Sequence, residues 1–318
     1  MIKLGIVMDP ISTINIQKDT SFAMLLEAQN RGYKIYYMEM NSLYLSAGKA
    51  RASTQVLSVK KEHTPYYTFN NEEDINLEML DIILMRKNPP FDRDFLYATY
   101  ILEIAEHQGV LVVNKPQSLR DCNEKLFTMW FPKYTPDTLV SKKDAHLRAF
   151  WKKHGDIILK PLNGMGGQSI FHIKSRDPNL TVIIENLTGY GRNFCMAQNY
   201  LPSIKDGDKR VFVIDGKTIP YCLARIPKIG ETRGNLIAGG QGEVRPLTKN
   251  DWKIADALAP TLKKKGLIFV GLDIIGQHLT EINVTSPTCV CEIEAAFPIS
   301  INGILLDAIE KRIILKKR

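Results

Sequence analysis

The stretch IILKPLNGMGGQSIFHIK, residues 157–174, decides the fold of this chain. An apolar run ends in Lys160, and glycines then occupy three of the four positions 164–167. A Walker A loop has its lysine after the glycines and leads into a helix, whereas here the lysine comes first and the alternating segment 169–174 predicts a strand. The stretch therefore predicts a β-hairpin whose glycine tip offers backbone N–H groups to phosphates above Lys160. The alternative interpretation is a mobile hairpin tip with a surface lysine.

The composition is that of a soluble globular enzyme. The chain has 318 residues, 44% hydrophobic and 24% charged, a length that suggests two or three domains of about 100–200 residues each. No apolar run approaches the ~18 residues of a membrane span, and the N-terminus lacks the pattern of a signal peptide. The five cysteines are scattered without a Cys-x-x-Cys pair, which favours a protein of the reducing cytosol. The Cys289-x-Cys291 pair has no second pair beside it, so we interpret it as two ordinary thiols.

The net charge of +8 is weak evidence for nucleic-acid binding. Five of the cations lie in the last eight residues, and the charge falls to +3 without them. A short basic tail is usually a solvated helix end. A non-catalytic nucleotide-binding or RNA-binding module nevertheless remains an alternative for the whole chain.

Strand and helix patterns alternate through the first 114 residues. Because βαβ repeats build parallel sheets, this order predicts a parallel sheet with helices on both faces. The first βα turn contains no Gly-x-Gly-x-x-Gly, so it is not a dinucleotide fingerprint. We expect a further helix from about 118 to 130 and a domain boundary near 120–125. The strands are predicted at 3–8, 33–40, 80–87 and 110–114, and the helices at 21–31 and 95–108.

The second half changes to short strands joined by turns, which predicts α+β architecture with antiparallel hairpins. Asp215-Gly216 is a strong hairpin signal. A two-residue loop there places Arg210 opposite Tyr221, with Arg225 on the same face. Because the guanidinium fork suits carboxylates and phosphates, the two arginines are candidates for a site.

Three oxygen-bearing side chains flank the Gly276 turn. Asp273, Glu281 and Asn283 are ligands of the kind that hold Mg²⁺. A three-residue loop at 276–278 places Asp273 opposite Glu281, whereas a two-residue loop places them on opposite faces, so the metal interpretation depends on register. The alternative is a set of polar residues on the solvent side of the hairpin.

Residues 226–246 contain five glycines and no strand or helix pattern. Structureless loops longer than about 12–15 residues are usually functional lids or disordered. Arg233 at the centre favours a lid that closes with a charged group.

Several segments together resemble the ATP-grasp ligases, and among them the bacterial glutathione synthetases. The resemblance runs along essentially the whole chain. Its segments are SFAMLLEAQNRGY (21–33), ILMRKNPPFD (83–92), NKPQSLRDCNEKLF (114–127), ILKPLNGMGG (158–167), MAQNYLP (196–202), IKDGDKRVFV (204–213), CLARIPKIGETRGN (222–235) and GLDIIGQHLTEINVTSPT (271–288).

The resemblance implies ATP-dependent ligation of γ-glutamylcysteine and glycine to glutathione, through an acyl phosphate and with release of ADP and phosphate. It implies Mg²⁺ or Mn²⁺ as cofactor, no nucleic-acid or membrane partner, a cytoplasmic location and a homotetramer. It assigns ATP binding to Lys125, Lys160, Gly164, Gly166, Gly167, Gln198, Asn199, Tyr200, Leu201 and Asp208. It assigns metal binding to Asp273, Glu281 and Asn283, and catalysis to Arg210, Arg225 and Arg233. It assigns substrate binding to Arg86 and Ser286.

The expected architecture has an N-terminal parallel-sheet domain and an ATP-grasp fold of two α+β lobes. The N-terminal domain is predicted at 1–122, the small lobe with the glycine hairpin at 123–200, and the large lobe at 201–318, with a lid at 226–242. One departure is Val290-Cys291-Glu292, where the family commonly has Ile-Arg-Glu. Ligases of the same class for another acceptor, such as D-alanine or glutamate ligases, remain alternatives.

Overall fold

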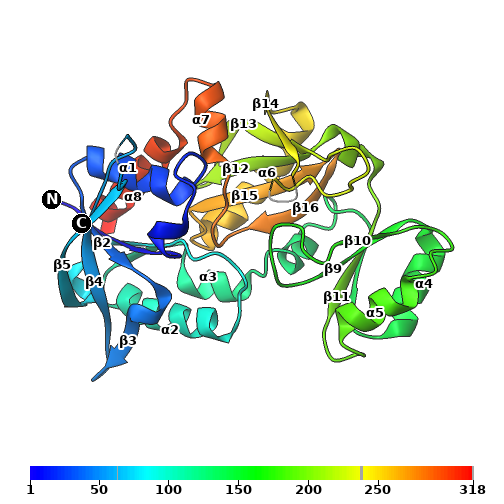
Figure 1. Cartoon of the computed structure of the whole chain (residues 1–318), viewed down its shortest axis with the longest axis horizontal. Helices are drawn as coiled ribbons and strands as arrows, with labels where there is room; N and C mark the ends of the chain where they lie inside the picture. Colours follow the sequence, from blue (N-terminus) through cyan, green and yellow to red (C-terminus); the bar gives the residue numbers. More distant parts are fainter. Residues whose placement is uncertain (63, 237–238, 317–318) are drawn as a thin grey trace.

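The computed structural model describes residues 1–62, 64–236 and 239–316. Its N-terminal part is built on a seven-stranded sheet in the order β3-β4-β2-β1-β6-β7, with β5 paired to β4 (Figure 1). The four predicted strands are present and pair in parallel, which confirms the βαβ interpretation. They are β1 (Lys3–Val7), β2 (Lys34–Met38), β6 (Ile82–Met85) and β7 (Leu111–Val113).

Three further strands of this sheet were not predicted, and they pair in antiparallel fashion, so the sheet is mixed rather than parallel. The hydrophobic alternation that identifies a strand is weak in them, because the buried positions of β4 include Ala50, Ala52 and Thr54 and because β5 is largely exposed. They are β3 (Leu43–Ser46), β4 (Lys49–Val59) and β5 (Tyr67–Asn76).

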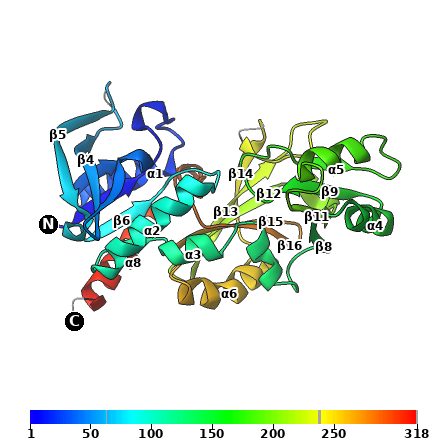
Figure 2. The same ribbon diagram turned by 90° about the horizontal axis from the view of Figure 1, so that it is seen from below.

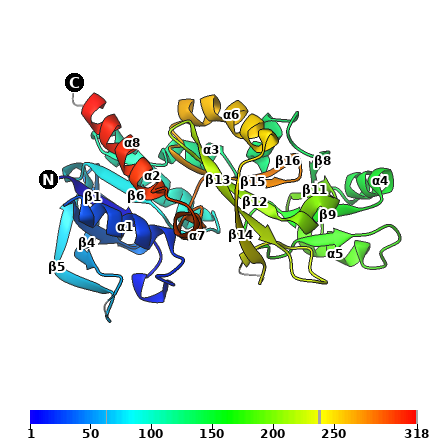
Figure 3. The same ribbon diagram turned by 90° about the horizontal axis from the view of Figure 1, so that it is seen from above.

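Helices cover both faces of the N-terminal sheet. Helix α1 (Thr20–Asn30) is capped by Asp19, whose side chain accepts the N–H of Phe22. It shares a buried cluster with the C-terminal helix α8 (Ile301–Lys316), whereas α2 (Arg93–His107) packs on the opposite face. Figure 3 shows α8 beside α1. Helix α8 also contacts the large lobe, where its Arg312 forms an ion pair with Asp215. The C-terminal helix therefore packs against both the N-terminal domain and the large lobe.

The helix predicted from 118 to 130 is wrong, because the structure breaks it into two short pieces. Helix α3 (Pro116–Asp121) ends before Asn123, and a 3-10 turn, η4 (Leu126–Trp130), follows. The Asn123 side chain accepts the N–H groups of Lys125 and Leu126. This local bond competes with a continuous helix and turns the chain towards the second half of the molecule.

The small lobe is a four-stranded antiparallel sheet, ordered β10-β9-β11-β8. Figure 2 shows this lobe, with α4 and α5, at the end of the molecule away from the N-terminal sheet. Strands β9 and β10 form the predicted hairpin around the glycine loop. The lobe has its own buried cluster, to which its two helices contribute. Its elements are β8 (Thr138–Ser141), α4 (Asp144–His154), β9 (Ile157–Pro161), β10 (Phe171–Ile173), α5 (Leu180–Thr188) and β11 (Cys195–Asn199).

The large lobe is a five-stranded sheet in the order β14-β13-β12-β15-β16, with α6 (Lys249–Lys264) and α7 (Val290–Ala296) packed against it. Every neighbouring pair in this sheet is antiparallel. Its strands are β12 (Asp208–Ile214), β13 (Lys217–Ile226), β14 (Gln241–Pro246), β15 (Phe269–Ile275) and β16 (His278–Asn283).

The structureless loop predicted at 226–246 is shorter than expected. Strand β14 occupies 241–246 and pairs with β13, and Ile226 still belongs to β13. The strand was missed because it is an exposed, polar edge strand with a proline at its end. The lid prediction at 226–242 thus narrows to 227–240, of which residues 237 and 238 lie outside the described part.

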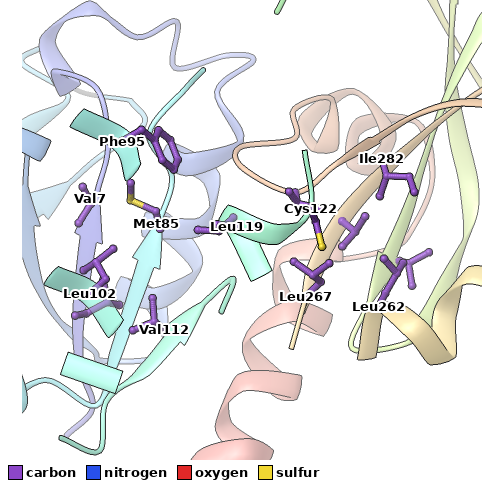
Figure 4. Close-up of a cluster of buried hydrophobic side chains, with 14 of the residues drawn as sticks. Val7, Met85, Phe95, Leu102, Val112, Leu119, Cys122, Leu262, Leu267 and Ile282 are labelled. Carbon is purple, nitrogen blue, oxygen red and sulfur yellow. The ribbon is translucent and has the colours of Figure 1, made fainter. Parts of the chain in front are cut away.

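Two hydrophobic clusters join the N-terminal domain to the large lobe. One of them runs from Phe95 and Met85 through Leu119 and Cys122 of the α3 region to Leu262 and other side chains of the large lobe (Figure 4). The small lobe has a separate core. No helix within the described ranges is long and apolar enough to cross a membrane.

Candidate functional site

The first cavity lies between the small-lobe and large-lobe sheets and measures about 110 Å³. Its walls include every residue that the resemblance assigns to ATP: Lys125, Lys160, Gly164, Gly166, Gly167, Gln198, Asn199, Tyr200, Leu201 and Asp208. Arg233, Asp273 and Glu281 also line it. The structure therefore gathers residues from widely separated segments of the sequence around one space.

Two buried lysines line this cavity in different electrostatic surroundings. The Lys125 ammonium contacts Glu281 Oε1 at 3.1 Å and the carbonyl of Gly164 at 3.3 Å. Within the part of the chain that the structure describes, the hydrogen-bond partner of Lys160 is the carbonyl of Thr280, at 3.4 Å. Burial lowers the pKa of Lys160 to about 8, whereas for Lys125 the attraction of Glu281 outweighs burial and the pKa is raised. Lys160 is thus a buried cation that lacks a close anion.

The glycine loop requires glycine at several positions. Gly164, Gly166 and Gly167 have φ values of +97°, +68° and +79°, where side-chain-bearing residues are strained. A Cβ on Gly167 would also come within 2.6 Å of the Asn235 side chain. Arg233 donates to the Gly167 carbonyl at 3.3 Å. The loop 227–240 therefore touches the glycine loop across the mouth of the first cavity.

A buried lattice of charges lies beneath the glycine loop. Arg210 Nε contacts Asp273 Oδ1 at 2.6 Å, and Arg225 Nη2 contacts Asp273 Oδ2 at 2.8 Å. Arg225 also contacts Asp208 Oδ2 at 2.5 Å. Burial alone would raise the pKa of Asp273, but the two guanidinium groups hold it well below its usual value. We call these four residues the arginine–carboxylate lattice.

The register of the β12–β13 hairpin differs from the prediction. The two-residue turn at Asp215-Gly216 is confirmed, since Ile214 pairs with Lys217. An irregularity between Val211 and Val213 then shifts the pairing by two residues, so Arg210 lies opposite Leu223 and not Tyr221. Pro220 stands in the irregular part and lacks the N–H that a regular ladder requires. A shift of two preserves the face, and Arg210 and Arg225 still meet at Asp273.

The β15–β16 hairpin places Asp273 opposite Glu281, but by a different route from the one expected. The turn has two residues, because Ile275 pairs with His278. A bulge at Thr280 adds one residue to β16 and brings Glu281 opposite Asp273. The Thr280 hydroxyl donates to the Asp273 carbonyl at 3.1 Å.

Asp273, Glu281 and Asn283 offer oxygen atoms suited to Mg²⁺. Asn283 uses its Nδ2 to donate to the Gly271 carbonyl, which leaves Oδ1 available as a ligand. Within the ranges that the structure describes, no group of three His, Cys, Asp or Glu side chains is arranged to hold a metal. The donor set fits Mg²⁺ when the Asn283 amide and oxygens of a bound phosphate are included, and Asp273 is then shared with the arginines.

A second cavity, of about 100 Å³, adjoins the first. Arg210, Arg225, Asn283 and Ser286 line it, and both cavities share Gly164, Gly166, Asp273 and Glu281. The Ser286 hydroxyl donates to Asn88 Oδ1 at 2.7 Å. The predicted metal ligands and catalytic arginines therefore lie where the two cavities meet.

Arg86 is not brought to either of these cavities. It is buried, donating to Ser21 Oγ and to the Pro287 carbonyl, both at 3.0 Å, and burial lowers its pKa to about 10. It borders a small separate cavity of about 10 Å³. In this structure Arg86 supports the segment around Pro287 and does not contact the space where a substrate would lie.

Cys291, at the position where the family commonly has arginine, is half-buried. Its thiol contacts the carbonyl of Asp19, at the start of α1, at 3.6 Å. Burial raises the pKa of this thiol to about 12. Cys291 therefore makes a neutral contact between α7 and α1.

Sequence reasoning missed Glu124. Its Oε1 accepts the N–H groups of Val284 and Thr285 at 2.8 and 3.0 Å and the Thr285 hydroxyl at 2.9 Å. Its backbone carbonyl accepts the N–H of Ile282 at 2.9 Å. Glu124 thus holds both sides of Asn283, and it lines the second cavity. In the sequence, only its position next to Lys125, in the segment NEKLF (123–127), could have indicated that Glu124 lies near the site.

Comparisons with known proteins identify the family of the chain. The family model described as "Prokaryotic glutathione synthetase, N-terminal domain" matches residues 2–120, and "Prokaryotic glutathione synthetase, ATP-grasp domain" matches 124–298. The chain is 69% identical to the glutathione synthetase of Escherichia coli (strain K12) over 313 residues, covering 98% of this chain and 99% of the relative. It is 68% identical to that of Salmonella typhimurium (strain LT2), with the same coverage.

Solved structures share the fold at low identity. One is D-cycloserine synthetase DcsG, with a TM-score of 0.67 and 13% identity, covering 98% of this chain and 99% of that one. Another is the ATP-grasp ligase PsnB complexed with minimal precursor, Mg and ADP, with a TM-score of 0.61 and 18% identity, covering 99% and 98%. The fold and the resemblance predicted from sequence are confirmed. The chain belongs to the prokaryotic glutathione synthetase family, and it is an ATP-grasp ligase of glutathione synthesis.

Proposed function

We propose that the chain joins the cysteinyl carboxylate of γ-glutamylcysteine to the amine of glycine, with ATP converted to ADP and phosphate. The family membership and the convergence of the predicted residues on two adjoining cavities support this proposal. The observation that carries it is the position of the metal-ligand candidates at the junction of those cavities, between the lysines and the arginines.

In the first step the first cavity holds ATP. Backbone groups of Gln198–Leu201 hold the adenine, Asp208 reaches the ribose, and Lys125 and Lys160 bind the phosphates under the glycine loop. Bound Mg²⁺, held by Asp273, Glu281 and Asn283, supplies charge neutralisation for the phosphates. A carboxylate oxygen of the acyl substrate attacks the γ-phosphorus, the bond to the β-phosphate oxygen breaks, and ADP remains.

In the second step the acyl phosphate lies in the second cavity beside Arg210 and Arg225. These guanidinium groups stabilise the charge on the phosphoryl oxygens, with Arg233 added from the loop 227–240. The nitrogen of the neutral amine attacks the carbonyl carbon and the C–O bond to phosphate breaks. The nitrogen gives up one proton, which the leaving phosphate can take, and keeps one hydrogen in the amide. Because an acyl phosphate is readily hydrolysed, we infer that the loop closes to exclude water.

The finer expectations stay predictions. They are the use of Mn²⁺, the homotetramer, the cytoplasmic location, the domain limits at 122 and 200, and substrate binding by Arg86 and Ser286. The position of Arg86 described above speaks for a supporting role.

A screen of acyl donors and amines for ADP release tests the proposal. We expect ADP and glutathione in equal amounts, with mass spectrometry identifying the product, when γ-glutamylcysteine and glycine are both present. D-Alanine and glutamate serve as comparison substrates. Formation of AMP would contradict the proposed reaction, and ADP release that does not depend on a γ-glutamyl dipeptide would contradict the proposed substrate.

A further inference from the structure

The backbone beside Asn283, one of the metal-ligand candidates, is held by side chains from outside the large lobe. Asn283 ends β16, and its pairing with Gly271 is the last one at that end of the β15–β16 ladder. Beyond that pair, the Glu124 carboxylate accepts the N–H of Val284 at 2.8 Å. The carbonyl of Val284 has a different partner, to which the proposed function gives no role.

That partner is Asn114, at the end of the N-terminal sheet. It directly follows β7 and is only 3% exposed. Its Nδ2 donates to the carbonyls of Phe269 and Val284, at 2.8 and 2.7 Å, and its Oδ1 accepts the N–H of Phe269 at 2.9 Å. A side-chain amide of the N-terminal domain thus bonds to two strands of the large lobe in the way that a backbone peptide would.

These bonds close the open end of the β15–β16 hairpin. Phe269 begins β15, the strand that carries Asp273, and Val284 comes directly after Asn283. Val284 is therefore held at its N–H by Glu124 and at its carbonyl by Asn114. The Asn283 amide itself makes a long hydrogen bond, 3.3 Å, to the carbonyl of Gly271. Its orientation consequently depends on how firmly the neighbouring backbone is held.

We propose that Asn114 is a positioning residue for the magnesium site, which holds the amide oxygen of Asn283 in place through the backbone of Val284 and Phe269. The proposal rests on the proposed function, in which Asn283 binds Mg²⁺. Residues that orient metal ligands from behind commonly account for about 10- to 100-fold in metal affinity. Because Asn114 belongs to the N-terminal domain, metal binding then depends on the contact between that domain and the large lobe.

The test is Asn114→Ala, with Asn302→Ala as the matched control. Asn302 is also 3% exposed, and its Nδ2 likewise donates twice, to the two carboxylate oxygens of Glu294 at 3.3 and 3.2 Å. This contact joins α7 to α8 and not the strands of the metal site. Both variants should unfold at a lower temperature, because each loses buried hydrogen bonds. Only Asn114→Ala should weaken the binding of Mg²⁺.

Calorimetric titration with ADP, with and without Mg²⁺, measures the metal site without turnover. In Asn114→Ala we expect the Kd of Mg·ADP to rise about 10- to 100-fold and the Kd of ADP alone to change little. An unchanged Kd of Mg·ADP would overturn the proposal. So would an equal rise with and without Mg²⁺, which would show that the whole nucleotide site is disturbed. If Mg²⁺ made no difference to the wild type, the magnesium site of the proposed function would itself be refuted.

Hydrogen exchange of the wild type tests the same proposal if Asn114→Ala does not fold. Since coupling is reciprocal, a metal that binds better because of Asn114 must also stabilise the bonds of Asn114. The N–H of Phe269, which Asn114 accepts, should therefore exchange more slowly with Mg·ADP than with ADP alone. The N–H of Asn302, which Glu294 accepts, is the internal control and should not change. Equal exchange of the Phe269 N–H in the two complexes would contradict the role of Asn114.

Discussion

Lys160 of the first cavity and the two arginines of the second cavity have opposite electrostatic surroundings. Among the described residues, the hydrogen-bond partner of buried Lys160 is a carbonyl at 3.4 Å, and burial lowers its pKa to about 8. In the second, Arg210 and Arg225 are already paired with Asp273, and Arg225 also with Asp208. The charge of Lys160 therefore has no close counter-ion in the described part of the chain until the phosphates of a nucleotide bind, whereas Arg210 and Arg225 have theirs in the free protein. We expect the unpaired lysine to lower the stability of the fold and to favour anion binding, and the paired arginines to raise its stability.

The largest effect is expected at the junction of the two cavities. Glu281→Gln removes a charged metal ligand candidate without opening the core, so ligation should fall about 1,000-fold or more, the equivalent of several kcal/mol. The substitution also removes the ion-pair partner of the buried Lys125, so the unfolding temperature should fall, while the variant stays folded at the assay temperature. Steady-state rates at saturating Mg²⁺ check this, with Glu243→Gln as a control that keeps full activity. Near-normal activity of the Glu281 variant would mean that the β15–β16 hairpin is misassigned.

The second prediction concerns the free energy of unfolding. Arg225→Met leaves two buried carboxylates short of a partner and should lower stability by about 3–5 kcal/mol. Lys160→Met should leave the free energy of unfolding unchanged or raise it by up to about 3 kcal/mol at pH 7. The reason is that the Lys160 amine binds its proton more weakly in the folded chain than in the unfolded chain, so burial of the charged form costs stability. The cost of burying Lys160 is full below pH 8 and disappears as the pH rises towards the ordinary lysine value.

Chemical denaturation of both variants, with ATP titrations alongside, measures this difference. Lys160→Met should bind ATP about 10- to 100-fold more weakly despite its unimpaired stability. If Arg225→Met and Lys160→Met lowered the free energy of unfolding equally, the proposed difference between the paired arginine and the unpaired lysine would be wrong.

The third prediction is a pH dependence of nucleotide affinity. Because the pKa of Lys160 is about 8 in the free protein, the lysine is charged at pH 7 and loses its proton above pH 8. The affinity for ATP should therefore be nearly constant from pH 6.5 to 7.5 and fall by up to about tenfold per pH unit above 8. The slope above pH 8 should be absent in Lys160→Met, and its persistence there would assign the titration to another group.

The smallest effect is expected in the loop 227–240. With ATP and acyl substrate bound, cleavage by trypsin after Lys228 and Arg233 should slow several-fold, because the loop already touches Gly167 and closes further. Cleavage after Lys61, in an exposed loop of the N-terminal domain, is the internal control. Equal rates with and without ligands would refute the closing movement.

The sequence allowed accurate prediction wherever a local pattern had one structural solution. The glycine hairpin, the two-residue turn at Asp215-Gly216 and the parallel strands of the N-terminal sheet are of this kind. Errors arose where tertiary structure overrides a local rule. The Thr280 bulge and the irregularity at Pro220 each change a register that loop length alone does not determine.

The site was predictable mainly through the resemblance, and its energetics were not. Nothing in the sequence near Asp273 indicates that two arginines from another hairpin neutralise it. Glu124 and strand β14 were missed because a buried carboxylate and an exposed edge strand both lack the hydrophobic pattern on which sequence interpretation depends.

The central claim is that the acyl substrate is activated by phosphorylation where the two cavities meet, and oxygen isotope transfer tests it most directly. γ-Glutamylcysteine labelled with ¹⁸O in both oxygens of its cysteinyl carboxylate is ligated to glycine, and the released phosphate is analysed by mass spectrometry. The account predicts one ¹⁸O atom in each phosphate, because that oxygen stays with phosphorus when the amine breaks the C–O bond. Phosphate without label, formed together with glutathione, would contradict the acyl phosphate and with it the roles assigned to both cavities.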